Sequence, residues 1–138
     1  MQSEFNIMNI SSTGLSAQRF RIELISTNIA NSETTRTENG EPYRRKVPVF
    51  QELLRNIQGR QENSGVIVKE IYEDPSQFRI VYDPTHPDAD ENGYVRLPNV
   101  NIIREMVDMI NAQRAYEANA TAINTTKAMI TSALQIGR

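Results

Sequence analysis

The stretch NVNIIREMVDMINAQRAYEANATAINTTKAMITSALQI, residues 99–136, decides the fold of this chain. It contains neither proline nor glycine, and the residue that follows it is Gly137. Asn99, placed directly after Pro98, is suited to cap the start of a helix, and Gly137 is suited to follow its last turn. At about 1.5 Å per residue the stretch predicts a helix about 57 Å long, which is longer than an ordinary globular helix.

Apolar side chains recur along this helix at alternating steps of four and three residues. Eight of the ten positions reached in this way are apolar, and the other two are Gln113 and Lys127. This spacing is typical of a coiled-coil seam. We expect the alanines Ala115, Ala118 and Ala122 to contribute to assembly as well. The seam positions predicted to form subunit interfaces are Ile102, Met106, Met109, Tyr116, Ala120, Ile123, Ile130 and Leu134.

The remaining faces of the second half of this helix carry almost no charge. Between Ala115 and Ile136 only Glu117 and Lys127 are charged, and most other positions are Ala, Thr, Asn or Ser. A solvated helix face normally carries many charged groups, whereas amides and hydroxyls can be satisfied across a helix contact. We therefore expect protein to surround this helix on most sides in its working state.

Residues 4–30 are predicted to form a second long helix with the same spacing. Gly14 lies in its middle, which lowers helix stability and marks either a kink or a close contact between helices. An intramolecular helical hairpin would explain the regular apolar spacing of both helices. Alternatively, the helices pair with each other and also present surfaces to neighbouring subunits. The interface residues predicted on this helix are Leu15, Ile22, Ile25 and Ile29.

The middle of the chain has a different composition, since residues 31–98 carry 21 of the 32 charges. We interpret it as a solvated linker and small outer domain on a helical stem made of residues 1–30 and 99–138. Residues 47–57 fit either a short helix or a strand, whereas 65–72, 77–82 and 94–97 are β-rich. The predicted fold class is α+β, with two long terminal helices paired as a coiled-coil stem and a small three-stranded insertion.

Composition and motifs argue against catalysis and ligand binding. The chain has no cysteine and a net charge of −2, so nothing suggests a thiolate metal site or a nucleic-acid partner. Residues 88–93 match the first half of a calcium loop, but Asn99 stands where the bidentate glutamate is required. The single histidine, His86, lies between two prolines without a catalytic partner. We expect no enzyme activity, cofactor, metal or small-molecule substrate.

Several short segments together form a recognisable pattern: NISSTGLSAQ (9–18), STNIAN (26–31), GEPYRRK (40–46), FQ (50–51), NGYV (92–95), LPNV (97–100), EMV (105–107) and RAYEAN (114–119). The signature residues among them are Asn28, Ala30, Asn31, Gly40, Tyr43 and Arg44. This pattern resembles the bacterial flagellar rod and hook proteins, and among them the C-type basal-body rod proteins of the proximal rod.

The resemblance implies a structural subunit of the proximal rod that polymerises through its terminal helices and transmits torque from rotor to hook. The implied partners are further copies, other rod subunits and the flagellar type III export apparatus, with the basal-body rings as additional candidates. The implied location is the rod, on the periplasmic side of the inner membrane. Export would occur without a cleaved signal peptide, in keeping with an N-terminus that lacks a basic segment before an apolar core.

A soluble helical-hairpin adaptor or export chaperone is the alternative function. Such a protein would show a charged outer face on both helices, and this sequence does not. Under the rod interpretation, Ile123→Asp is predicted to abolish assembly by burying an unpaired charge, while residues 47–98 remain folded.

Overall fold

The computed structural model describes residues 2–57 and 59–137, and the α+β class predicted from the sequence is confirmed. Met1 and Arg138, the outermost residues of the predicted stem, lie outside the described residues. The elements in chain order are α1 (Gln2–Ala30), β1 (Lys46–Ile57), β2 (Arg60–Glu73), β3 (Arg79–Tyr82), β4 (Tyr94–Leu97) and α2 (Ile102–Ile136).

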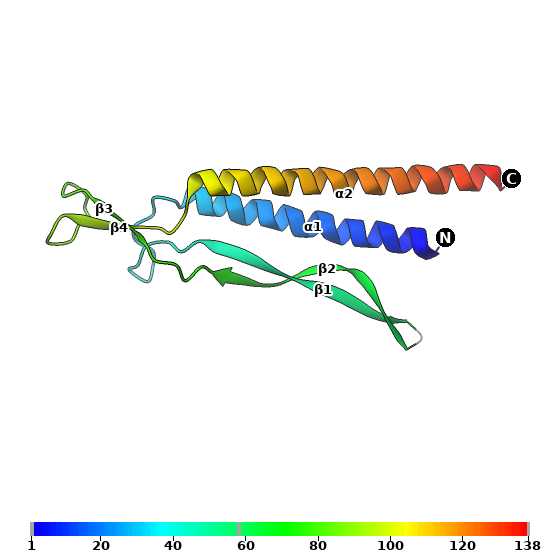
Figure 1. The fold of residues 1–138 in the computed structure, drawn as a ribbon, viewed down its shortest axis with the longest axis horizontal. Coiled ribbons are helices and arrows are strands. Elements are labelled where there is room, and N and C mark those ends of the chain that lie inside the picture. Colours follow the sequence, from blue (N-terminus) through cyan, green and yellow to red (C-terminus); the bar gives the residue numbers. More distant parts are fainter. Residues whose placement is uncertain (1, 58, 138) are drawn as a thin grey trace.

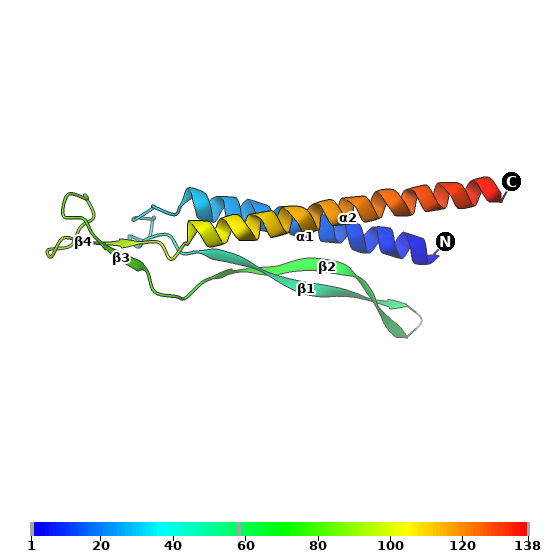
Figure 2. The same cartoon turned by 45° about the horizontal axis from the view of Figure 1, so that its top comes forward.

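The two terminal helices lie side by side and run in opposite directions (Figures 1 and 2). Helix α2 starts two residues later than predicted, because its N-cap is Asn101 rather than Asn99. The Asn101 side chain accepts a hydrogen bond from the Arg104 backbone N–H at 3.1 Å. The helix ends at Ile136 as predicted, and the N–H of Gly137 donates to the carbonyl of Ala133 at 3.2 Å.

The face of α2 that packs inside the chain is made of small and polar residues. Its buried positions are Glu105, Ala112 and Thr126, and Asn119 completes a series with steps of seven residues. This line has the predicted period and lies one residue before one half of the predicted seam, whereas the other half alternates with it at steps of three and four residues. The reason is close approach: a Cβ added to Gly14 of α1 would lie 3.0 Å from the Asn119 side-chain amide. Gly14 therefore marks a close helix contact, one of the two alternatives left open by the sequence.

Helix α1 lies between α2 and the β1–β2 hairpin and contacts both. Of its predicted interface residues, Ile25 is buried, whereas Leu15, Ile22 and Ile29 are half-buried. Much of the apolar surface of α1 is thus already covered within one chain.

The β-rich region forms two separate two-stranded antiparallel sheets, so the predicted three-stranded insertion is wrong. Strand β1 pairs with β2 over its whole length, from Lys46 opposite Glu73 to Ile57 opposite Arg60. Residues 47–57 are therefore a strand, because pairing with a long partner overrides the helix preference of their leucines. Strands β3 and β4 pair at the end of the molecule away from both termini (Figure 1).

The β1–β2 hairpin lies along α1 and is fastened to it by two polar contacts. The Asn9 amide donates to the carbonyl and the hydroxyl of Ser64, each at 3.3 Å. The Thr13 hydroxyl accepts from the backbone N–H of Val66 at 3.1 Å. Between them, Gly65 has φ +132°, and an added Cβ would lie 2.1 Å from the Thr13 hydroxyl. Only glycine permits this approach of strand to helix.

Candidate assembly surfaces and the polar clasp

A buried polar cluster joins the end of α1, the start of β1 and the start of α2, and we call it the clasp: Asn28, Tyr43, Arg45, Asn99 and Glu105. The Glu105 side chain is fully buried in α2, and its Oε1 accepts from Arg45 Nε at 2.5 Å. The same guanidinium lies 3.5 Å from Asp108 and 3.7 Å from Asp74. Because a buried carboxylate is stable only with a partner, Arg45 holds β1 and α2 in a fixed relation.

Asn28 occupies the centre of the clasp with 1% of its surface exposed. Its Nδ2 donates to the Lys46 carbonyl at 2.8 Å and to Glu105 Oε2 at 3.1 Å. Its Oδ1 accepts from the Lys46 N–H and from the Tyr43 hydroxyl, each at 2.9 Å. Burial raises the pKa of Tyr43, and the nearby Glu105 and Glu73 charges raise it further. Both amide donors and the amide oxygen are satisfied, as a buried asparagine requires.

Asn99 extends the clasp toward β3. Its Oδ1 accepts from the Arg45 N–H at 2.8 Å, and its Nδ2 donates to the Asp74 carbonyl at 2.9 Å and to Ser76 Oγ at 3.0 Å. Hydrogen bonds from Ser76 are the main reason that the pKa of the Asp74 carboxyl is lowered, and Arg45 adds to the effect. The asparagine predicted to cap α2 therefore ties together three chain segments instead.

The structure assigns local roles to the signature residues. Asn28 and Tyr43 belong to the clasp, and the Arg44 guanidinium lies 4.2 Å from the centre of the Phe78 ring. Asn31 donates its amide to the Thr27 carbonyl at 2.9 Å as the chain leaves α1. Gly40 has φ +76° in an open turn, and Ala30 is exposed at the end of α1.

The Arg45–Glu105 pair was not predicted from the sequence. Both residues appeared there only within the matching segments GEPYRRK (40–46) and EMV (105–107). A signal was present, because Glu105 begins the seven-residue series that continues with Ala112, Asn119 and Thr126. A charge on a line of small residues needs a partner from another segment.

The side of α2 that faces away from the buried line exposes large apolar side chains, and we call it the outer face: Ile103, Met106, Val107 and Ile110. Their exposed fractions range from 50% for Ile110 to 76% for Ile103. Contiguous exposed apolar patches on soluble proteins commonly mark interaction sites. A single chain therefore leaves uncovered the side chains best suited to bind another protein.

The predicted interface residues of α2 lie on different sides of the helix: Met106 is on the outer face, whereas Met109 and Ile123 lie beside the buried line. Ile102, Met106, Tyr116 and Leu134 are exposed, whereas Met109, Ala120, Ile123 and Ile130 are half-buried. Their role in contacts between subunits stays a prediction.

The loops between β3 and β4 use their polar side chains to shape turns. Asp90 Oδ1 accepts from the N–H groups of Asn92 and Tyr94 at 2.9 and 2.8 Å, and His86 Nδ1 accepts from the Asp88 N–H at 3.0 Å. Within residues 2–57 and 59–137, no three acidic or histidine side chains are grouped to hold a metal ion.

Comparison with known proteins identifies the family. The model of the flagella basal body rod protein family matches residues 8–36, and that of the flagellar basal body rod FlgEFG protein C-terminal region matches residues 91–136. None of the helices in the described part of the chain combines the length and apolar character needed to cross a membrane.

Three relatives that match nearly the whole chain are flagellar basal-body rod proteins FlgC. The flagellar basal-body rod protein FlgC of Borreliella burgdorferi is 49% identical, with 96% of each chain covered. FlgC of Bacillus subtilis is 46% identical over 97% of this chain and 98% of its own, and that of Yersinia enterocolitica is 42% identical over 99% of both. At these identities and coverages, the chain belongs to the family of flagellar basal-body rod proteins represented by FlgC.

Proposed function

We propose that the chain is a structural subunit of the flagellar rod and that the outer face of α2 binds neighbouring subunits. One observation carries this proposal. Helix α2 buries Glu105, Ala112 and Thr126 inside the chain, whereas Ile103 and Met106 are 76% and 56% exposed. Burial of such side chains between subunits would supply about 1.5–3 kcal/mol for each one fully covered.

The architecture suits a part that transmits torque. The clasp fixes β1 and both helices at one end by charge-assisted hydrogen bonds, and Gly14 brings the helices into close contact along the stem. Densely packed interiors have low compressibility, so a tube of such stems would resist twisting. Contacts between different faces of identical subunits can propagate into an open helical assembly.

Partners and location follow from rod membership. We infer that other rod subunits contact the chain, that it travels through the flagellar type III export apparatus without a cleaved signal, and that it resides on the periplasmic side of the inner membrane. The basal-body rings are further partners under this proposal. The family names support the basal-body rod as the location.

The adaptor or export chaperone is not favoured. A soluble adaptor needs a solvated outer surface, whereas the outer face here presents isoleucine, methionine and valine.

The test is complementation of a bacterial strain that does not swim because its own FlgC has been deleted. We expect Ile103→Asp to abolish swimming and basal-body rods in electron micrographs, because a charge would be buried between subunits. The unfolding midpoint of the isolated variant should remain close to that of the unchanged chain, since Ile103 is exposed in it. Ile80→Asp is the matched control, because Ile80 is 66% exposed on β3, and it should keep assembly. Normal swimming of Ile103→Asp would contradict the proposal.

A further inference from the structure

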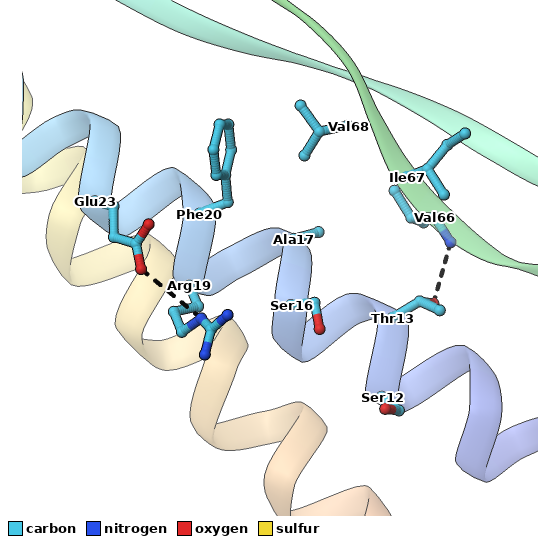
Figure 3. A pocket seen from close by; sticks show the side chains of 10 residues that line it. All are labelled: Ser12, Thr13, Ser16, Ala17, Arg19, Phe20, Glu23, Val66, Ile67 and Val68. Carbon is cyan, nitrogen blue, oxygen red and sulfur yellow. Dashed lines mark hydrogen bonds and ion pairs between the residues drawn. The ribbon is translucent and has the colours of Figure 1, made fainter.

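A groove runs between α1 and β2, on a part of the molecule that the proposed function has not used (Figure 3). It encloses about 410 Å³. Its apolar wall is formed by Ala17, Phe20, Val66 and Val68, and hydroxyl groups come from Ser12, Thr13 and Ser16. At one margin Arg19 and Glu23 form an ion pair at 3.8 Å and are well exposed.

The groove is built into the fold. The contacts of Asn9 with Ser64 and of Thr13 with Val66 set the distance between the hairpin and α1. Gly65 allows close contact at that point, and Phe20 lines the groove further along α1. The two polar contacts therefore anchor the hairpin beside the groove.

The last turns of α2, like the groove, have no role in the proposed contact of the outer face. We call these turns, residues 128–136, the distal segment. It carries no charged residue, and every residue from 131 to 136 is exposed. Met129, Leu134 and Ile136 are 61%, 59% and 85% exposed. Figures 1 and 2 both show that α2 continues past the start of α1, so the end of this segment has no partner in the first helix.

The distal segment has an apolar side and a polar side. Met129, Ala133 and Ile136 are spaced by four and three residues and therefore share one side of the helix. Gln135 is two residues from Ala133, about 200° around the helix axis. An uncharged helix end without a packing partner is marginal in water, and this one has a side suited to burial.

We propose that the distal segment of α2 from one copy docks in the α1–β2 groove of a second copy of this chain. The inference rests on the proposed function of an assembling subunit and names one of its contacts. The groove presents apolar carbon and small hydroxyl side chains without a charge in its interior, which matches an uncharged segment whose apolar side is formed by Met129, Ala133 and Ile136. This contact needs no ion pair, so no charged group has to lose its hydration when the contact forms.

The two surfaces belong to different parts of one molecule, so the contact is heterologous. The groove borders the middle of α1, whereas the distal segment lies past the beginning of that helix (Figure 1). A chain therefore cannot fill its own groove. Repetition of a heterologous contact that does not close on itself generates an open helical array.

Disulfide cross-linking tests this contact directly, because the chain has no cysteine of its own. Two full-length variants, Ser16→Cys and Ala133→Cys, are purified separately, mixed and treated with a mild oxidant. A disulfide requires the two Cα atoms to come within about 7 Å. We expect the mixed dimer to form at least about ten times faster than in matched mixtures, a difference of 1.4 kcal/mol in effective activation free energy.

Two matched mixtures serve as controls. Gln135→Cys replaces Ala133→Cys and places the thiol on the other side of the same helix turn. Ser26→Cys replaces Ser16→Cys and places it on an exposed part of α1 outside the groove. Adding Ile136→Asp to the Ala133→Cys variant should remove the preference, while circular dichroism should show unchanged helix content.

The outcomes separate this inference from the proposed function. Equal rates in all mixtures, or no cross-linking at any concentration, would overturn the docking of the distal segment on a second copy. If the Ser16→Asp variant still assembles and swims, the groove contact also fails, whereas rod membership stands. If the unchanged chain cannot restore rods in a strain lacking FlgC, the proposed function fails independently of any cross-link.

Discussion

The two ends of the molecule are built in different ways. At the clasp end, Glu105 and Asn28 are buried and each polar group has a partner from another segment. At the other end, the distal segment of α2 is exposed and uncharged. One end has its polar groups satisfied within a single chain, whereas the other would gain its partners by association under the proposed docking. The contrast separates the part that is stabilised inside one chain from the part that we propose binds a neighbour.

The largest expected effect is on the clasp. Arg45→Ala should lower the free energy of unfolding by about 3–5 kcal/mol, because it leaves Glu105 buried without its charged partner. Urea unfolding followed by circular dichroism measures the change. The double variant Arg45→Met with Glu105→Leu should recover most of the loss. A single variant as stable as the unchanged chain would mean that the clasp does not hold this end together.

The attachment of the hairpin should be the next most sensitive feature. Gly65→Ala should lower the free energy of unfolding by roughly 2–3 kcal/mol, since alanine is strained at a positive φ and its methyl group would contact Thr13. Gly40→Ala is the matched control, because Gly40 has φ +76° but no atom within 4 Å of an added Cβ. It should cost roughly 1–2 kcal/mol from backbone strain alone. Equal losses in thermal unfolding would contradict the contact with Thr13.

A smaller effect of opposite sign is expected inside the stem. Gln18 Oε1 is buried on α1 and has no hydrogen-bond partner among the described residues. Gln18→Met should therefore raise the free energy of unfolding by about 1 kcal/mol, because it removes an unsatisfied acceptor. Gln113→Met, at an exposed position of α2, should leave it unchanged. Destabilisation by Gln18→Met would show that the amide is satisfied in solution.

The smallest effect concerns pH and the loops beyond the clasp. Asp88 accepts from the Thr35 hydroxyl at 2.7 Å and pairs with Arg36 at 2.6 Å. The hydrogen bond from Thr35, aided by Arg36, lowers the pKa of the Asp88 carboxyl. A lowered pKa stabilises the fold above the ordinary value of about 4, and this stabilisation is lost as pH falls through the folded-state pKa.

Amide exchange by NMR checks the pH effect. Protection of the Ala89 N–H should decrease as the carboxyl is protonated, while the Lys46 N–H in the clasp keeps its protection. Asp88→Asn should show the weaker protection already at neutral pH. An Ala89 N–H that is insensitive to pH would contradict a role for Asp88 in this link.

The sequence predicted the features that repeat and missed those that depend on one contact. The two long helices and their seven-residue period follow from the spacing of apolar side chains, which recurs along each helix. The buried line is displaced by one residue from one half of the predicted seam, because Gly14 brings α1 close to Asn119. The other half, which includes Met109, Ile123 and Ile130, lies beside the buried line and is half-buried, so its contacts with other subunits stay a prediction.

Pairing between distant segments explains the remaining differences. Residues 47–57 have no decisive period of their own and become a strand because β2 pairs with them. Asn99 was predicted to cap α2, but in the structure it bridges Arg45 and Asp74, and Asn101 provides the cap. The signature residues Asn28 and Tyr43 were found through resemblance, whereas their common contact in the clasp required coordinates.

Hydrogen exchange of the same chain, isolated and within assembled basal bodies, tests the contrast between the two ends most directly. The account predicts that amides around Asn28 and Lys46 are protected in both states. Amides of residues 128–136 should exchange rapidly in the isolated chain and at least about 100-fold more slowly after assembly, a difference of about 2.7 kcal/mol in opening free energy. Rapid exchange of the distal segment inside the finished rod would contradict the account.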